Sequence, residues 1–410
     1  MPFRITLLTF AGALTLALAA CGGQPAPPSS SAPGDAAGDG HGAVSGAEEV
    51  AEPQLGLTVI DPDGSVTHLD LLDESVAELG EVEGPTDLAT DGRYLFAETS
   101  GGVEIVDSGV WTWDHIDHFH YYRADARLLG TVEGEGPATV ATTNLSTTGS
   151  TGISFSASGD AVLLDTEALS KGEITERFRV RREPHDGLVV PVGSFALVTE
   201  ASDGVGATVV GYTAGGEKTG LEEACVDPAG TITTRVGAVI GCEDGALLAH
   251  VVDGELQVER IPYPAGAGAV PVRVFDNREG RPSVAGLAGE DGIWLLDTRE
   301  RAWTLLPAPT PLAHVTAVDD EDGTLLALAR DGRVLVLNGA DGTVIAETAP
   351  LVAGSLAAGA APTLIADQQR AYLSAPTERR LYEIDYADGA RVARTFETAT
   401  EPAFVAETGR

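Results

Sequence analysis

Short apolar runs separated by polar turns repeat along the chain from about residue 56 to its end. Each run has about five to seven residues rich in Val, Leu, Ala and Ile, and the turns often contain Asp-Gly. The segment 324–337 holds two such runs, divided by Asp331 and Gly332. Runs of this length joined by tight turns predict antiparallel strands. Because no long stretch has the 3.6-residue period of an amphipathic helix, the pattern predicts an all-β protein.

The strands also recur with a larger period of about 40 residues, which is typical of the four-stranded blades of a β-propeller. We expect inner strands to begin near Thr86, Ala138, Gly187, Glu223, Val272, Val315 and Pro362. The run 402–408 resembles one more inner strand, and the runs 56–60 and 66–71 resemble outer strands. Together these ends would close the ring and leave no free sheet edge. We therefore predict a single β-propeller of about eight four-stranded blades over residues 54–410. Seven blades, or an array of β-sandwiches, are the alternatives.

The N-terminus has the layout of an export signal. Arg4 precedes an apolar stretch, residues 5–20, that is too short to span a membrane comfortably. It ends in Leu-Ala-Ala-Cys-Gly, which matches a lipobox, so we expect Cys21 to be lipidated after cleavage. The lipid would hold the protein at the outer face of the cytoplasmic membrane. Residues 21–53, rich in Gly, Ala, Pro and Ser, are expected to form a flexible tether. An ordinary signal peptide, residues 1–20, with an incidental cysteine is the alternative.

Charge and cysteine content narrow the interpretation further. A formal net charge of −37 at pH 7 repels phosphate backbones, which excludes nucleic-acid binding. Besides Cys21, the chain contains only Cys225 and Cys242. In an oxidising compartment these two predict a disulfide, and a pair of zinc-binding thiolates is the alternative. We expect the protein to be a monomer.

One insertion, residues 111–122, breaks the repeat and reads Trp-Thr-Trp-Asp-His-Ile-Asp-His-Phe-His-Tyr-Tyr. It contains three of the eight histidines and two aspartates, namely His115, His118, His120, Asp114 and Asp117. On an extended backbone His118 and His120 point to the same side, because side chains alternate between faces. Two imidazoles on one face suit a tetrahedral ion, and imidazole with carboxylate suits zinc. A solvated polar loop whose aromatic side chains pack on the propeller is the alternative.

Ligands from elsewhere in the chain are needed to complete such a site. His185, in Glu-Pro-His-Asp-Gly, comes just before an inner strand, and Glu98 ends a strand. We predict both as metal ligands beside His118 and His120. Additional ligands, or acceptors for an imidazole N–H, are expected among His115, Asp117, Asp114 and His314. By our strand count, however, the insertion lies at the opposite ends of the strands from His185 and Glu98. A shared site requires the insertion to fold across the axis, or the count to be wrong by one.

Three runs resemble the AztD family of periplasmic zinc metallochaperones: Asp-His-Ile-Asp-His-Phe-His from residue 114, Gly-Glu-Gly-Pro from residue 134, and Glu-Pro-His-Asp-Gly from residue 183. The similarity covers most of the chain after the tether. It implies a propeller that accompanies a zinc-uptake ABC transporter and hands zinc to the substrate-binding protein of that transporter. It also implies that His118, His120 and His185 correspond to zinc-binding histidines of the family.

The chain departs from the family pattern in three ways. Asp186 and Thr139 stand where histidine is usual, and the tether lacks a dense run of histidines. The resemblance therefore supports the first zinc site and leaves a second one open.

Three functions compete at this point. The first is a zinc-binding metallochaperone that is not an enzyme, since imidazole and carboxylate ligands on a loop are accessible to ligand exchange with a partner. The second is a propeller hydrolase or lactonase with an axial metal, in which His185 and a carboxylate would act as the base. The sequence shows no Gly-x-Ser-x-Gly nucleophile elbow. The third is a surface scaffold for a protein or glycan, with structural histidines. We expect the first, with zinc bound and no catalytic residues.

Overall fold

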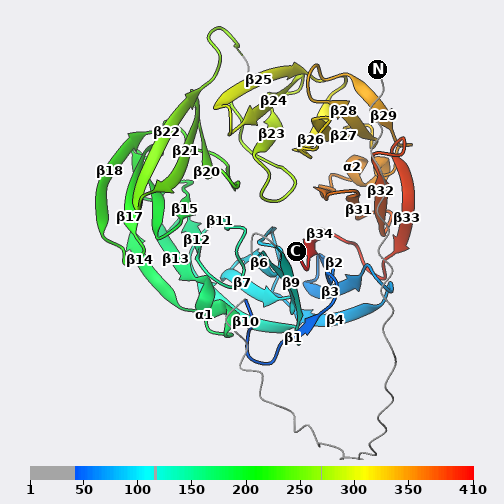
Figure 1. The fold of residues 1–410 in the computed structure, drawn as a ribbon, viewed down its shortest axis with the longest axis horizontal. Coiled ribbons are helices and arrows are strands. Elements are labelled where there is room, and N and C mark those ends of the chain that lie inside the picture. The colour runs from blue at the N-terminus through cyan, green and yellow to red at the C-terminus, as the bar shows by residue number, and fades with distance from the viewer. Residues whose placement is uncertain (1–41, 115–117, 269) are drawn as a thin grey trace, which may run out of the picture. The chain divides into compact units, whose positions relative to one another are not determined.

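Eight antiparallel sheets follow one another around a ring (Figure 1). The structure is a computed structural model, and it describes residues 42–114, 118–268 and 270–410. Within these residues seven of the eight sheets have four strands and one has three. The predicted eight-bladed propeller is therefore confirmed. The expected signal peptide and Cys21 lie outside the described residues. In the part of the chain that is described, no helix has the length and apolar character needed to cross a membrane.

The first blade is composite, and its strands lie in the order β34 (Phe404–Thr408), β2 (Gly56–Ile60), β3 (Ser65–Asp70) and β4 (Val76–Glu81). Leu57 of β2 is opposite Glu407 of β34 on one side and Leu69 of β3 on the other. The C-terminal strand thus takes the inner position and the N-terminal strands take the outer ones. This closes the ring in the way that the sequence predicts.

The other blades follow in chain order. The second consists of β5 (Asp87–Thr90), β6 (Tyr94–Thr99), β7 (Gly102–Asp107) and β10 (Arg127–Glu133). The third consists of β11 (Ala138–Ala141), β12 (Ser150–Phe155), β13 (Asp160–Asp165) and β14 (Glu176–Arg181). The fourth consists of β15 (Val189–Val192), β16 (Phe195–Ser202), β17 (Val205–Thr213) and β18 (Lys218–Ala224). The fifth consists of β19 (Thr231–Thr233), β20 (Ala238–Cys242), β21 (Gly245–Val252) and β22 (Glu255–Pro262).

The last three blades complete the circle. The sixth consists of β23 (Ser283–Leu287), β24 (Gly292–Asp297) and β25 (Ala302–Pro307). The seventh consists of β26 (Leu312–Ala317), β27 (Thr324–Ala329), β28 (Val334–Asn338) and β29 (Val344–Glu347). The eighth consists of β30 (Leu364–Ala366), β31 (Ala371–Ala375), β32 (Arg380–Asp385) and β33 (Arg391–Glu397). Two short helices, α1 (Thr166–Ser170) and α2 (Ala353–Ala357), lie in connections.

The core lies between neighbouring blades. Phe96 and Ile105 of the second blade, for example, share one buried cluster with Ile153 and Phe155 of the third. The middle strands are covered on both faces, so their sequences are continuously apolar, and every residue of β27 is buried. Outer strands such as β29 face solvent and are largely exposed. This difference explains why apolar runs, rather than strict alternation, mark the blades in the sequence.

Two of the expected inner strands differ from the prediction. Glu223 lies in β18, an outer strand, and the inner strand of the next blade begins at Thr231. The reason is the long hairpin of β17 and β18, which lengthens the fourth blade. Near Val272 the described residues form no inner strand. Isolated bridges instead join Asp276 to Ala285, Asn277 to Ala317 and Gly280 to Thr234. Pro271 has no N–H to donate to a ladder at this point.

The predicted disulfide between Cys225 and Cys242 is confirmed, with a Cα–Cα distance of 5.1 Å. Both cysteines are buried, and the bond ties the residue after β18 to the end of β20. The pair therefore does not supply thiolates to a metal. The two cysteines enclose a short loop, so the crosslink is expected to stabilise the fold by about 3 kcal/mol.

Candidate metal centre

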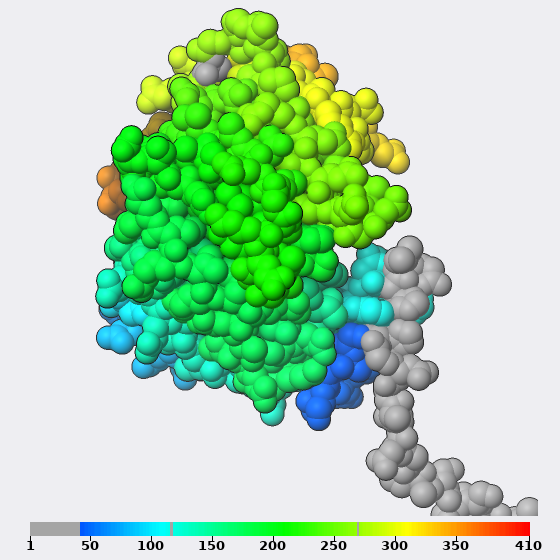
Figure 2. All heavy atoms as spheres, turned by 90° about the vertical axis from the view of Figure 1, so that its left-hand side faces the viewer, coloured from blue at the N-terminus to red at the C-terminus, as the bar shows by residue number. Residues whose placement is uncertain are grey.

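The insertion between β7 and β10 forms a small sheet of its own. Its strands β8 (Val110–Asp114) and β9 (Phe119–Arg123) pair as a hairpin. A third strand, β1 (Glu48–Val50), comes from the stretch that we expected to be a tether and pairs with β9. The strand order is β1-β9-β8. Figure 2 shows the blue N-terminal residues and a cyan segment standing out from one face of the ring.

Aromatic stacking and a buried ion pair anchor this sheet to the second blade. The rings of Trp111 and Tyr122 are both buried and stack with 5.2 Å between centroids. The guanidinium of Arg93 lies 3.7 Å from the Trp111 ring centroid. Asp107 accepts two hydrogen bonds from that guanidinium, each of 2.8 Å, and both side chains are buried. Trp111 and Tyr122 therefore fix the base of the hairpin to the propeller.

The hairpin also packs against the last residues of the chain. The Thr112 backbone N–H donates to the Arg410 carbonyl oxygen at 2.8 Å, and the Thr112 hydroxyl donates to the Gly409 carbonyl at 2.7 Å. Asp114 ends β8, and its carboxylate lies 3.9 Å from the Arg235 guanidinium. These contacts place the hairpin on the face of the ring where the inner strands end, close to the axis.

His118 and His120 meet at the start of β9. Their Nε2 atoms are 2.9 Å apart and their ring centroids are 4.7 Å apart. The alternation of side chains along the strand puts both rings on one side, as the spacing predicts. In a tetrahedral zinc site, Zn–N bonds of about 2.05 Å require about 3.3 Å between two ligand nitrogens. A small side-chain rotation would therefore admit a zinc ion between these two atoms.

A third residue of the site, Glu49, was missed by the sequence analysis. Its Oε1 atom lies 2.7 Å from Nδ1 of His120. A carboxylate in this place holds the proton on Nδ1 and leaves the Nε2 lone pair for a metal, which also makes the imidazole a stronger ligand. No sequence signal singles out Glu49 among the 62 acidic residues, because only the pairing of β1 with β9 brings it to the hairpin.

The tip of the hairpin, residues 115–117, lies outside the described residues, so the predicted ligands His115 and Asp117 are not placed. Within the residues that are described, no group of three or more His, Cys, Asp and Glu side chains has the arrangement of a metal site. What the structure brings together is the pair His118 and His120, with Glu49 behind His120.

His185 lies elsewhere and is buried with both ring nitrogens engaged. Nδ1 is 2.7 Å from the carbonyl oxygen of Glu183, and Nε2 is 2.9 Å from the hydroxyl of Thr199. Thr199 donates its backbone N–H to the carbonyl of Leu188, just before β15 begins. His185 thus lies on the face of the ring where the inner strands begin.

Glu98 lies on that same face. Glu98 pairs with Asp87 at the start of β5. Tyr94, at the other end of β6, pairs with Asp107, the last residue of β7. The hairpin follows Asp107 and therefore leaves the blade at the end that is opposite to Glu98. Burial raises the pKa of Glu98. The structure therefore brings neither Glu98 nor His185 to the hairpin. As the sequence indicated, the described residues of the insertion lie at the opposite ends of the strands from His185 and Glu98.

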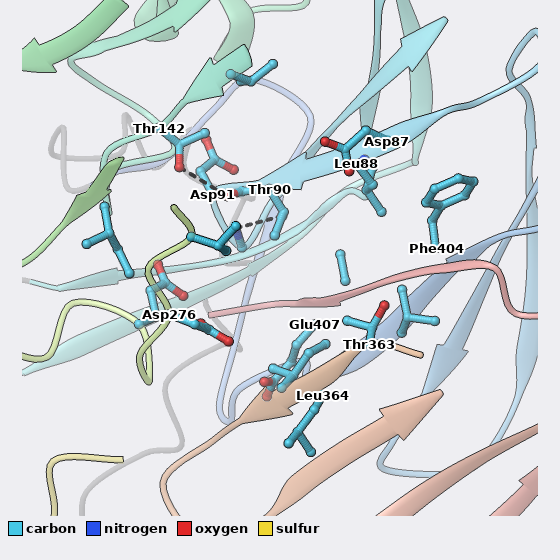
Figure 3. A pocket seen from close by; sticks show the side chains of 18 of the residues that line it. Asp87, Leu88, Thr90, Asp91, Thr142, Asp276, Thr363, Leu364, Phe404 and Glu407 are labelled. Carbon is cyan, nitrogen blue, oxygen red and sulfur yellow. Dashed lines mark hydrogen bonds between the residues drawn. The ribbon is translucent and has the colours of Figure 1, made fainter. Parts of the chain in front are cut away.

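A cavity of about 960 Å³ lies among the inner strands (Figure 3). His314, one of the additional ligands that we expected, lines this cavity, and its Nε2 atom is 2.6 Å from Asp276 Oδ2. Asp91, Glu279, Glu407 and Arg410 line it as well. His314 is therefore the partner of a carboxylate inside the ring and is not part of the hairpin.

No family model matches the chain. Two solved structures of AztD from Citrobacter koseri, one of them of the apo protein, are similar to it, with TM-scores of 0.75 and 0.74. The sequence identities are 21% and 20%, and the similarity covers 88% of this chain and 99% of each AztD chain. At this identity the likeness shows the fold. The fold that the sequence motifs implied is thus confirmed.

Proposed function

We propose that this chain, which has the AztD-type fold, is an extracytoplasmic zinc metallochaperone that binds zinc on the β8–β9 hairpin. The observation that carries the proposal is the convergence of His118 and His120, 2.9 Å apart at Nε2, with Glu49 on the far nitrogen of His120. Histidine oriented by a carboxylate is a common feature of zinc sites. The proposed metal is zinc, because neutral imidazole and carboxylate are ligands that it favours.

The two histidines supply two of the four ligands that zinc usually takes. We assign the other two positions to two of the three residues Asp114, His115 and Asp117. The proposed site does not include His185 or Glu98, because they lie on the opposite face of the ring.

The position of the hairpin supports handover of the metal. His118 is exposed, and the neighbouring Phe119 is 52% exposed although it is apolar. A partner that docks on this face could replace the ligands one at a time. The proposed partner is the substrate-binding protein of a zinc ABC transporter. The chain's net charge of −37 would favour a basic contact surface on that partner.

The location belongs to the same proposal. A lipid on Cys21 would hold the protein at the outer face of the cytoplasmic membrane. The chain between Cys21 and β1 would act as the tether, so that the propeller reaches its partner while it remains anchored.

Zinc titration of the metal-free, full-length chain tests the proposal, beside His118→Ala/His120→Ala and the control His250→Gln. His250 lies in β21, away from the hairpin. We expect about one zinc per chain, lost in the double variant and kept in the control. A transfer assay to the substrate-binding protein follows. Equal zinc binding by the double variant, or none by any form, contradicts the proposal. Turnover of esters or lactones by the loaded protein would instead favour a hydrolase.

A further inference from the structure

The segment that precedes the first blade lies against the hairpin of the proposed metal site. Residues 42–50, here called the strap, contain β1, which pairs with β9 over three positions with Glu49 opposite Tyr122 in the middle. At the other end of the strap, the carbonyl oxygen of Gly42 accepts a hydrogen bond of 3.2 Å from Nε1 of Trp111. The strap therefore contacts both strands of the hairpin.

The strap is attached at the surface. None of the residues 42–50, all of which the structure describes, is buried. The side chain of Glu49, which contacts His120, is 58% exposed. Segments that bury little apolar surface and keep their backbone hydrogen bonds close to water open at a small cost in free energy. The strap is therefore expected to detach from the hairpin far more often than the blades open.

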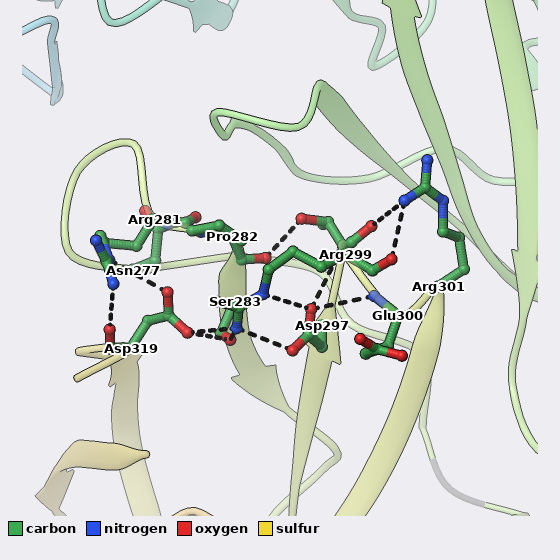
Figure 4. A network of polar contacts seen from close by, with 10 residues as sticks. Asn277, Arg281, Pro282, Ser283, Asp297, Arg299, Glu300, Arg301 and Asp319 are labelled. Carbon is green, nitrogen blue, oxygen red and sulfur yellow. Dashed lines mark hydrogen bonds and ion pairs between the residues drawn. The ribbon is translucent and has the colours of Figure 1, made fainter. Parts of the chain in front are cut away.

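A firmly held connection of this protein looks different. The loop before β23 is fixed by the polar network of Figure 4. Arg281 donates to the carbonyl oxygen of Asp319 at 2.7 Å, and Arg299 donates to Oδ1 of the same residue at 2.7 Å. Asp319 is only 7% exposed, and buried, charge-assisted hydrogen bonds of this kind resist opening. The contact between Glu49 and His120 has no such protection from water.

The hairpin has anchors that do not depend on the strap. Trp111 stacks on Tyr122 and lies under the guanidinium of Arg93, which belongs to the second blade. Thr112 is hydrogen-bonded through its backbone and its hydroxyl to the last two residues of the chain. None of these contacts involves the strap. The strap can therefore detach while the hairpin stays in place on the ring.

A short exposed stretch joins the strap to the first blade. Ala51 and Glu52 are exposed. Gln54, in contrast, is only 8% exposed, and the carbonyl oxygen of Leu55 accepts a hydrogen bond of 3.0 Å from the backbone N–H of Leu71. The chain is thus fixed to the first blade from Gln54 onward, and the exposed residues before it can act as a hinge.

We propose, on the basis of the function proposed above, that the strap controls how tightly the hairpin retains zinc: when docked it holds Glu49 against His120, and when detached it takes this carboxylate away. A carboxylate on the far nitrogen strengthens an imidazole as a metal ligand, so the docked strap retains zinc and the detached strap releases it. By linkage, bound zinc stabilises docking by the same factor by which docking raises zinc affinity. A receiving protein that detaches the strap would thereby promote handover.

Amide hydrogen exchange of the full-length chain with and without zinc, read by mass spectrometry of the strap peptide, tests the proposal. We expect zinc to slow exchange in the strap about tenfold, and Gly42→Ala to speed it and to lower zinc affinity by up to about tenfold. Gly42 has a φ of +74°, and an added Cβ would lie 2.4 Å from Cγ of Trp113, so the variant detaches the strap while Glu49 is kept. The control Gly254→Ala, in the turn between β21 and β22, has a φ of +82° and open space around it.

Ala47→Pro is a second variant that detaches the strap, because it removes the backbone N–H that Ala47 donates to the Val44 carbonyl at 3.0 Å. Equal exchange of the wild-type strap with and without zinc overturns the proposal. Wild-type zinc affinity in a variant whose strap exchanges rapidly also overturns it, and leaves the metallochaperone function intact. Absence of zinc binding by the wild-type chain would instead overturn both proposals.

Discussion

The Oε1 atom of Glu49 lies 2.7 Å from Nδ1 of His120, although 71 positions separate the two residues in the chain. The contact exists because β1 adds itself to β9 as a third strand, with Glu49 opposite Tyr122. The N-terminal segment thus orients a histidine that we propose as a zinc ligand. If a partner displaced β1 from β9, the Glu49 carboxylate would leave the His120 imidazole and zinc binding would weaken.

We expect Glu49→Gln to lower zinc affinity by about 10- to 100-fold, because a neutral amide no longer favours the Nδ1–H tautomer of His120 or strengthens its Nε2 as a ligand. Competition with a chromogenic zinc chelator measures the effect. Glu48→Gln removes the same charge from the neighbouring position of β1 and serves as the control. Equal losses in both variants would point to general electrostatics and contradict the specific role of Glu49.

The buried Arg93–Asp107 ion pair should be the strongest single anchor of the hairpin. Asp107→Asn leaves the Arg93 guanidinium buried without its counter-charge, so we expect a loss of about 3–5 kcal/mol in unfolding free energy. The exposed pair of Arg333 and Glu347 is the control, and Glu347→Gln should cost about 0–1 kcal/mol. Urea unfolding of the metal-free chains gives both values. If Asp107→Asn and Glu347→Gln caused similarly small losses of unfolding free energy, the ion pair would not be an anchor and aromatic stacking would hold the hairpin.

Asp91 should make the metal-free fold less stable as pH rises. Its pKa of about 7 in the folded chain exceeds the ordinary value of 3.8, so the folded state binds the proton more tightly. Stability from this group is complete below the ordinary pKa and is lost as pH rises towards the folded pKa, at about 1.4 kcal/mol per pH unit. Asp91→Asn keeps an oxygen that accepts hydrogen bonds from the backbone N–H groups of Arg93 and Tyr94 but does not titrate.

The stability advantage of Asp91→Asn should therefore grow between about pH 4 and pH 7 and level off above. Unfolding midpoints in chelator across this range measure it. Parallel pH profiles for the variant and the wild type would show that Asp91 titrates normally.

Removal of the disulfide should affect stability and leave zinc binding intact. The double variant Cys225→Ala/Cys242→Ala is expected to lose about 3 kcal/mol, because the unfolded chain gains freedom when the loop opens. Denaturant unfolding measures the loss, and zinc titration of the same variant is the second readout. A fall in zinc stoichiometry in the folded variant would reveal a metal role for the cysteines that their pairing does not indicate.

Local pattern carried most of the fold prediction. The apolar runs with Asp-Gly turns gave the strands, and the unmatched runs at the two ends predicted the composite blade that β34 and β2 form. The pairing of Cys225 with Cys242 could be predicted because the only other cysteine in the sequence, Cys21, is expected to carry the lipid. Hairpin length varies from blade to blade, so the period of about 40 residues predicts the wrong strand for Glu223, which lies in the outer strand β18.

The sequence by itself determined the propeller, its closure, the disulfide and the common face of His118 and His120, because each depends on short-range periodicity or on composition. Only the tertiary structure decided that Glu49 reaches His120, that His185 and Glu98 lie on the other face of the ring, and that Asp91, Glu279 and Glu407 share one cavity. These relations join residues from different blades or from outside the blades. They depend on how the ring closes and where an inserted hairpin packs, which no local pattern encodes.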